Sequence, residues 1–249
     1  MGFIDLSMEE NIATVVLNRP KVNAINEGVV DELSGCLKKL ETDPSVRAVI
    51  LTGEGSFFSF GFDIPEFLGY PKDSFTGFLM RFTDILRYIF LFPKPVVAAL
   101  NGHTIAGGCM LAIACDYRLM VSGKPKISLN EITFGSTVFT SGVEILKFWV
   151  GGKNAETILY GGEMYTAEDA RALGLIHEVV GKEGIREAAR SVAKGLAKRD
   201  GRAFKSVKTL LRKQVAEEIE RRERDSILEF VDIWYSEDTW KNLEKIKIY

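Results

Sequence analysis

The sequence predicts an α/β fold with parallel strands, followed by a helical C-terminal part. Over the first two thirds of the chain, short apolar or β-branched runs alternate with longer segments whose apolar residues recur at helical spacing. Strands separated by helices favour parallel pairing with right-handed crossovers. From Gly184 to Tyr249 the pattern is mostly helical and more charged, so we place a boundary near residue 195.

Each expected element rests on apolar spacing and on residues that start or stop helices. Asn26 can cap a helix in which Val30, Leu33, Leu37 and Leu40 recur at helical spacing. The run 107–116 is apolar almost throughout, which predicts a helix buried on all sides. In chain order we expect a hairpin of 3–8 with 11–18, a helix after 26, a strand at 47–53, a helix from 74 to about 92, a strand at 96–100, the buried helix at 107–116, a strand at 117–121 and a helix at 166–173.

Composition excludes several classes of protein. The chain has 249 residues, 46% of them apolar, and a net charge of −2, which gives no general attraction to nucleic acid or to an anionic membrane. The longest strongly apolar stretch, Val96–Leu100, is far shorter than a membrane span, and the N-terminus lacks a signal-peptide pattern. Cys36, Cys109 and Cys115 form no CxxC or zinc spacing, so we expect no metal site and a cytoplasmic location.

Two glycine-containing turns follow predicted strands and are the first candidates for a site. They are Phe57–Ile64 (FFSFGFDI) and Asn101–Met110 (NGHTIAGGCM), in which Gly107–Gly108 opens the buried helix. Backbone N–H groups at a helix start lack partners and suit an anion, or an oxygen that becomes one. The alternative is that the glycines only make tight turns and close helix packing, which on spacing alone is the commoner case.

Several motifs in order resemble the enoyl-CoA hydratase/isomerase, or crotonase, superfamily. They are LNRPKVNAIN, FFSFGFDI, AALNGHTIAGGCMLAIACDYRL and LNEITFG, and the likeness extends from about residue 10 to 180, including AEDARALGLIHEVV. The resemblance implies a spiral of ββα units over residues 1–195 and a helical region at 196–249 that serves trimerisation or as a lid. It also implies a homotrimer or a dimer of trimers, and an acyl-CoA thioester substrate with no separate cofactor.

The resemblance assigns main-chain groups to the substrate. The backbone N–H groups of Phe62 and Gly107 are expected to hold the thioester carbonyl and to stabilise an enolate-like oxygen, each contributing about 3–4 kcal/mol to lowering the barrier. The segment Phe60–Ile64, which includes Gly61 and Asp63, is expected to hold the adenine of coenzyme A. Ala24 and Ile25 are expected to line the opposite side.

The acid/base groups favour isomerisation among the reactions of this superfamily. Hydratases carry two glutamates, whereas this chain has Met110 at the first position and Glu131 at the second. A single glutamate that follows AGGC and an apolar residue resembles the pattern of 3,2-trans-enoyl-CoA isomerases. We expect an apolar setting around Met110, Phe134 and Phe139 to raise the pKa of Glu131 and make it a better base. Without the motif, an exposed surface glutamate would be the simpler interpretation.

The phosphates of coenzyme A need local cations, and Lys21 and Lys208 are the candidates. Lys208 lies in the basic segment 194–213, where Phe204, Val207, Leu210 and Leu211 form an apolar stripe. This spacing predicts an amphipathic helix with its charges on the outer face, and a purely solvated face is the alternative to phosphate contact. Nucleic-acid binding is a poor interpretation because the cluster is short and lacks interleaved aromatics.

Other residues and functions stay as alternatives. We assign no chemistry to His103, His177 or Cys109. His103 and Cys109 are expected to be structural, and His177 is expected to lie on the surface of a strand. The same site could support hydration or thioester hydrolysis, or the chain could be a CoA-binding module without activity. A pocket lined by bulky phenylalanines would suit an apolar or aromatic acyl group and exclude charged ones; these are Phe60, Phe62, Phe134 and Phe139.

Overall fold

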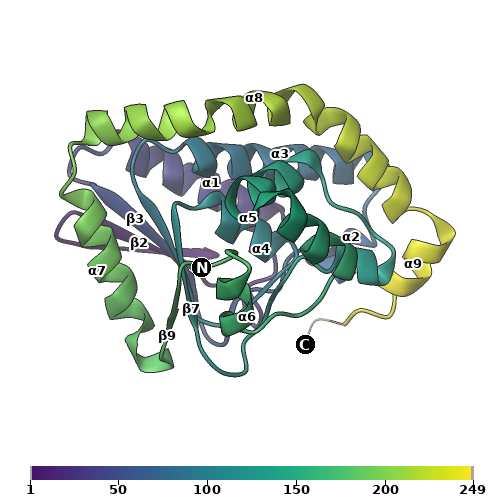
Figure 1. The fold of residues 1–249 in the computed structure, drawn as a ribbon. Helices are drawn as coiled ribbons and strands as arrows, with labels where there is room; N and C mark the ends of the chain where they lie inside the picture. The colour runs from purple at the N-terminus through teal and green to yellow at the C-terminus, as the bar shows by residue number, and fades with distance from the viewer. Residues whose placement is uncertain (1, 248–249) are drawn as a thin grey trace.

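The expected α/β fold with a helical C-terminal part is confirmed by a computed structural model that describes residues 2–247 (Figure 1). The strands are β1 (Ile4–Glu9), β2 (Ile12–Leu17), β3 (Ala48–Gly53), β4 (Phe57–Ser59), β5 (Val96–Leu100), β6 (His103–Ile105), β7 (Tyr117–Val121), β8 (Ile127–Ser128) and β9 (Glu178–Val180). The helices are α1 (Glu27–Thr42), α2 (Ile64–Phe67), α3 (Lys72–Leu91), α4 (Gly107–Ala114), α5 (Thr140–Gly161), α6 (Ala167–Ala172), α7 (Ile185–Ala197), α8 (Gly201–Trp234) and α9 (Glu237–Leu243), with 3₁₀ turns η1 (Glu131–Phe134) and η2 (Lys182–Gly184).

The larger sheet has six strands in the order β1-β2-β3-β5-β7-β9. The first pair forms the expected antiparallel hairpin, and every other neighbouring pair is parallel. All six residues of β3 are buried because helices cover both faces of this sheet, which explains its continuous apolar sequence. On one face α7 packs Ala189 and Ala193 against the strands, and on the other face lies the main core.

A second, three-stranded sheet of β4, β6 and β8 is not predicted from the sequence. Each of its strands follows a strand of the larger sheet, so the pairs β3–β4, β5–β6 and β7–β8 each lead into a helical segment. This arrangement is the expected series of ββα units. The small strands have two or three residues each and pair only with segments distant in sequence, which leaves no local periodicity to detect.

Helix α4 is buried along its whole length, as its apolar sequence predicts. Helix α8 is the longest, with 34 residues, and crosses over α3 and α5 at the top of the view in Figure 1. In the described part of the chain, no helix is long and apolar enough to cross a membrane. Residues 2–247 also contain no group of three side chains that could hold a metal ion.

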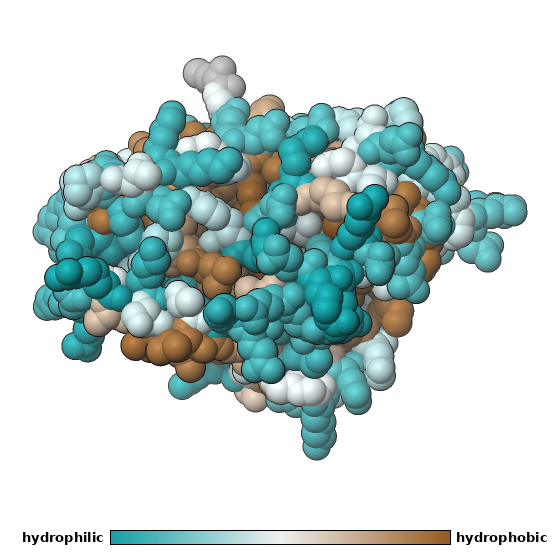
Figure 2. Space-filling view, turned by 90° about the horizontal axis from the view of Figure 1, so that it is seen from above, coloured by the Kyte–Doolittle hydropathy of each residue, from teal (hydrophilic) through white to brown (hydrophobic). Residues whose placement is uncertain are grey.

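The prediction for the basic segment 194–213 is wrong in two respects. The segment is not one helix, because α7 ends at Ala197 and α8 begins at Gly201. The side chain of Asp200 caps α8 by accepting a hydrogen bond from the N–H of Ala203. The expected stripe also faces outward, since Val207, Leu210 and Leu211 are 56%, 80% and 64% exposed. Figure 2, which looks down on the molecule from the side of α8, shows apolar residues among charged ones on this surface.

Two cations of α8, Lys208 and Arg212, point inward because they find partners there. The Lys208 ammonium lies 2.8 Å from the carboxylate of Asp116, and the Arg212 guanidinium lies 3.0 Å from it. Both also donate hydrogen bonds to carbonyls at the C-terminal end of α3, those of Ile89 and Phe90. Cations at a helix C-terminus interact favourably with its dipole, so this contact fixes α8 on α3.

Candidate active site

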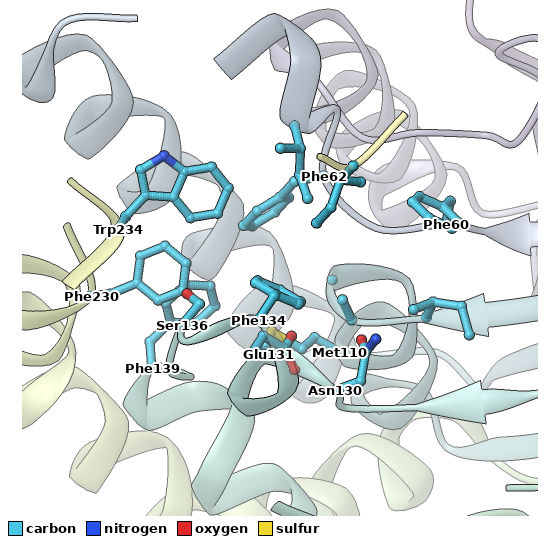
Figure 3. Close-up of a pocket in the computed structure, with 15 residues that line it drawn as sticks. Phe60, Phe62, Met110, Asn130, Glu131, Phe134, Ser136, Phe139, Phe230 and Trp234 are labelled. Atoms are coloured by element: carbon cyan, nitrogen blue, oxygen red, sulfur yellow. The ribbon is translucent and has the colours of Figure 1, made fainter. Parts of the chain in front are cut away.

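A cavity of about 210 Å³ lies where the start of α4, the turn η1 and the end of α8 meet (Figure 3). Its walls come from segments far apart in the sequence. The lining residues are Phe60, Phe62, Ile64, Ile105, Ala106, Gly107, Met110, Asn130, Glu131, Phe134, Ser136, Phe139, Phe230, Trp234 and Ile246.

The two glycine-containing turns lie next to each other at the N-terminal end of α4. A Cβ atom added to Gly61 would lie 3.2 Å from the backbone nitrogen of Gly107 and 2.9 Å from the carbonyl oxygen of Ile105. Gly61 has a φ of 95°, which a residue with a side chain rarely adopts. The N–H groups of Phe62 and Gly107 have no hydrogen-bond acceptor among the described residues. Two unpaired amides therefore lie beside one cavity.

Both interpretations of the Gly107–Gly108 pair apply, one to each residue. A Cβ on Gly108 would lie 2.6 Å from the carbonyl oxygen of Ser59, so this glycine lets α4 pack closely on β4. A Cβ on Gly107 would lie 3.1 Å from the ring of Phe62, at the wall of the cavity. Gly107 thus keeps the amide accessible, whereas Gly108 serves packing.

Glu131 is the first residue of η1 and is 5% exposed. Its Oε2 atom has no hydrogen-bond partner in the described structure. Burial raises its pKa to about 8, because desolvation disfavours the charged form. Among the lining residues it is the one ionisable side chain, and Met110 supplies only an apolar surface there. A carboxyl group with these properties can exchange a proton with a bound ligand near neutral pH.

Six aromatic side chains form much of the apolar part of the wall. Phe60, Phe62, Phe134 and Phe139, singled out from the sequence, all line the cavity. Phe230 and Trp234 of α8 also line it and were missed by the sequence analysis. Their i, i+4 spacing shows that they share a helix face, but it does not show which cavity that face meets.

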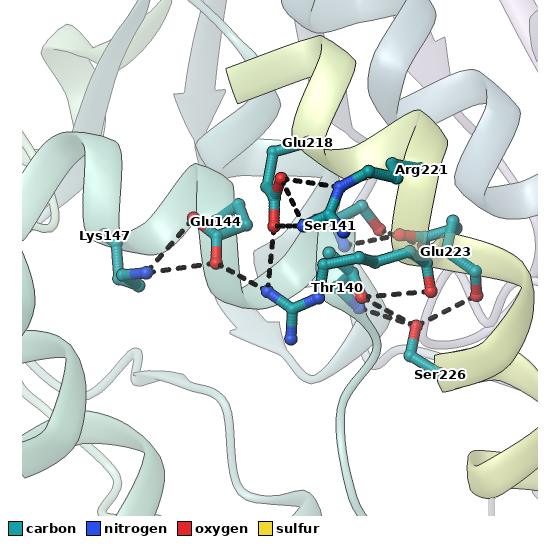
Figure 4. A network of polar contacts seen from close by, with 9 residues as sticks. Thr140, Ser141, Glu144, Lys147, Glu218, Arg221, Glu223 and Ser226 are labelled. Atoms are coloured by element: carbon teal, nitrogen blue, oxygen red, sulfur yellow. Dashed lines mark hydrogen bonds and ion pairs between the residues drawn. The ribbon is translucent and has the colours of Figure 1, made fainter. Parts of the chain in front are cut away.

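A network of polar contacts fixes α8 against the start of α5 (Figure 4). The buried carboxylate of Glu223 accepts hydrogen bonds from the N–H and the hydroxyl of Ser141, both at 2.7 Å. The hydroxyl of Ser226 accepts a hydrogen bond from the N–H of Thr140 at 3.0 Å. Burial raises the pKa of Glu223 to about 7. Because α5 starts directly after Phe139, this network sets that ring relative to the aromatic residues of α8.

The family of the chain follows from its match to known proteins, because the family model described as enoyl-CoA hydratase/isomerase matches residues 7–242. The chain belongs to the enoyl-CoA hydratase/isomerase family. It is 32% identical over 213 residues to a probable enoyl-CoA hydratase of Bacillus subtilis, covering 85% of this chain and 82% of that protein.

Isomerases of this family are also similar to the chain. It is 29% identical over 253 residues to the mitochondrial enoyl-CoA delta isomerase 1 of Rattus norvegicus, covering 96% of this chain and 85% of that protein. The crystal structure of human mitochondrial delta3-delta2-enoyl-CoA isomerase matches with a TM-score of 0.92 and 27% identity, covering 97% of this chain and 95% of that chain. The resemblance to the crotonase superfamily is thus confirmed.

The other residues expected to contact coenzyme A lie in different settings. The backbone of Ile25 accepts a hydrogen bond from the N–H of Asp63 and donates one to the carbonyl of Gly61, so it holds the first turn in place. Both Ile25 and its neighbour Ala24 are buried outside the cavity lining. The Asp63 carboxylate caps α2 and pairs with Arg19 at 2.6 Å. Lys21 is exposed.

Lys208 does not reach the cavity. Its ammonium is held in the buried ion pair with Asp116, so a solvent-facing role on a phosphate is incorrect for this residue. Burial is also the largest cause that lowers its pKa, to about 8.

Three further residues have structural settings outside the cavity lining. The Nδ1 atom of His103 accepts a hydrogen bond from the N–H of Lys126, and that of His177 accepts one from the N–H of Arg118. Desolvation lowers the pKa of both histidines, that of His177 to about 4. Burial raises the pKa of the Cys109 thiol strongly, which makes it a poor nucleophile.

Proposed function

We propose that this protein isomerises a 3-enoyl-CoA to the 2-trans-enoyl-CoA, with Glu131 as the single proton carrier. One observation carries the proposal: the cavity contains one ionisable side chain, buried and without a partner on Oε2, beside two unpaired main-chain amides. Because both hydratases and isomerases are similar to the chain, the choice between them rests on these groups.

The reaction moves one proton and rearranges two double bonds. The thioester oxygen accepts hydrogen bonds from the N–H groups of Phe62 and Gly107, which form an oxyanion hole. The Glu131 carboxylate removes a proton from the α-carbon, and the electron pair of that C–H bond delocalises to give a dienolate. The protonated Glu131 then donates the same proton to the γ-carbon. The oxyanion collapses to the carbonyl, and the double bond ends between the α- and β-carbons.

Hydration would need a second group that Met110 cannot supply. Adding water across the double bond requires one group to activate water and a proton source for the α-carbon. A thioether has no proton to give and does not act as a base at neutral pH. Isomerisation needs a single carboxyl group, since the proton that leaves is the proton that returns.

Coenzyme A is part of the substrate in this proposal, and no separate cofactor is required. The main chain of Phe60–Ile64 would contact the adenine, with Ala24 and Ile25 behind this turn, and Lys21 is the remaining cation candidate for a phosphate.

We further propose a cytoplasmic homotrimer or dimer of trimers, supported by the exposed apolar residues of α8. In light scattering, Leu210→Glu should then shift the protein toward monomers.

The decisive experiment offers the purified protein 3-hexenoyl-CoA and crotonyl-CoA in parallel. We expect conjugated 2-hexenoyl-CoA from the first substrate and little 3-hydroxybutyryl-CoA from the second. Efficient hydration of crotonyl-CoA would favour a hydratase, and release of free CoA would favour a thioester hydrolase. Binding of acyl-CoA without any turnover would indicate a module that lacks activity.

A further inference from the structure

The cavity gathers buried polar atoms that lack partners. Among residues 2–247, such side-chain atoms occur in Arg118, Asn130, Glu131, Ser136 and Trp234. All of these residues except Arg118 line the cavity. Since buried polar groups in folded proteins are nearly always hydrogen-bonded, each unpaired one in a binding site is free to bond a group on the ligand or a water molecule.

The proposed reaction accounts for only some of these unpaired polar atoms. Oε2 of Glu131 is the proton acceptor, and Asn130 is the partly buried residue before it. In Figure 3 the indole nitrogen of Trp234 lies on the side of that ring remote from Glu131. The Ser136 hydroxyl has no role in proton transfer to the α- or γ-carbon, yet its residue is only 5% exposed.

The position of Ser136 is defined by its backbone. Its N–H donates a hydrogen bond of 3.0 Å to the carbonyl of Glu131, and the preceding Gly135 has a φ of 84° that reverses the chain after η1. Figure 3 shows the hydroxyl oxygen among the rings of Phe134, Phe139 and Phe230, on the aromatic side of the cavity. An acyl group that passes Glu131 toward these rings would bring its more distant carbons to this hydroxyl.

We propose that the acyl group carries an uncharged polar substituent, a hydroxyl or a keto group, that hydrogen-bonds to Oγ of Ser136. This proposal rests on the proposed acyl-CoA site and narrows its substrate class. Serine can donate to a keto oxygen and can donate to or accept from a hydroxyl. A carboxylate is excluded, because no cationic side chain lines the cavity and the Glu131 carboxyl group faces the same space.

The test measures binding of saturated thioesters, which cannot isomerise, by titration calorimetry. The probes are hexanoyl-CoA, 5-hydroxyhexanoyl-CoA, 5-oxohexanoyl-CoA and adipoyl-CoA. The native protein should bind the hydroxy or oxo probe about threefold more tightly than hexanoyl-CoA, and adipoyl-CoA should bind worst. In Ser136→Ala the preference should reverse to about tenfold in favour of hexanoyl-CoA, because the substituent is then buried without a partner.

Thr137→Ala is the matched control, since Thr137 is the adjacent hydroxyl residue and lines only the neighbouring cavity, whereas Ser136 lines both. Its selectivity should equal that of the native protein, and both variants should keep the native unfolding temperature within a few degrees. A native protein that prefers hexanoyl-CoA, or a Ser136→Ala selectivity equal to the native one, would overturn this proposal alone. Failure of all four probes to bind would overturn the acyl-CoA site as well.

Discussion

Two largely buried carboxylates flank helix α4, and they have opposite surroundings. Asp116, just beyond the end of the helix, accepts a hydrogen bond of 2.7 Å from the N–H of Val96 and pairs with Lys208 and Arg212. Glu131, beside the start of the helix at the cavity, leaves Oε2 without a partner and has a pKa of about 8. Burial alone therefore does not produce a base; burial without counter-charges does.

The largest effect is expected on activity, and it is expected for Glu131 and not for Asp116. Glu131→Gln keeps the shape of the side chain and removes the proton acceptor, so kcat should fall by about 10²–10⁴-fold. Acyl-CoA binding should persist, since the amides of Phe62 and Gly107 that we propose hold the thioester oxygen are unchanged. The measurement is conversion of 3-hexenoyl-CoA together with calorimetric binding of hexanoyl-CoA. Retention of more than a tenth of the native rate would remove Glu131 from the mechanism.

The second prediction concerns stability rather than chemistry. Asp116→Asn leaves two cations buried without a counter-charge, and we expect a loss of about 3–5 kcal/mol in the free energy of unfolding. Urea denaturation measures this loss. Glu218→Gln is the control, because its ion pair with Arg221 is solvent-exposed on the arginine side, and removing it should change stability by less than about 1 kcal/mol. Equal effects of the two changes would show that the buried ion pairs of Asp116 contribute no more to stability than an exposed ion pair.

The third prediction uses the raised pKa of Glu131. Proton abstraction needs the carboxylate, of which about a tenth is present at pH 7 when the pKa is about 8. The value of kcat/KM should rise about tenfold per pH unit below 8 and level off above it. A flat profile between pH 6 and 9 would contradict the assignment.

The same shift makes stability depend on pH with a defined sign. The folded state binds this proton more tightly than the unfolded state, whose pKa is near 4.5. The contribution is therefore fully present below about pH 4.5 and is lost as the pH rises through about 8. Glu131→Gln should lack this component when the free energy of unfolding is measured against pH.

The smallest effect is expected at Glu223, a buried carboxylate that is hydrogen-bonded but has no buried ion pair. Glu223→Ala removes the acceptor for the N–H and hydroxyl of Ser141, which should lower the free energy of unfolding by about 1–2 kcal/mol. KM for 3-hexenoyl-CoA should rise more than kcat changes, because the aromatic wall loosens while Glu131 stays in place. Glu229→Ala, on the exposed side of α8, should leave both constants unchanged.

The sequence predicts best the parts whose signals are local. Apolar spacing predicts the hairpin, β3, β5, β7, α3 and α4. The family motifs indicate Glu131 and the two glycine-containing turns from the sequence alone. The aromatic residues Phe230 and Trp234 gave no such signal, since they come from a helix about 100 residues beyond Glu131 and meet the cavity only through tertiary packing. The small sheet escaped prediction for the same reason.

Residue types in order determined the family, and the resemblance to that family led to the expectation of ββα units and of a single glutamate at the site. Tertiary structure decided which charges are buried and which apolar residues are exposed. Periodicity along α8 assigns Leu210 to the core and Lys208 to solvent, yet the free C-terminal carbonyls of α3 and the carboxylate of Asp116 reverse that choice. The physical reason is that a helix pattern gives the direction of a side chain relative to its own axis, whereas burial depends on the groups that the rest of the chain places opposite it.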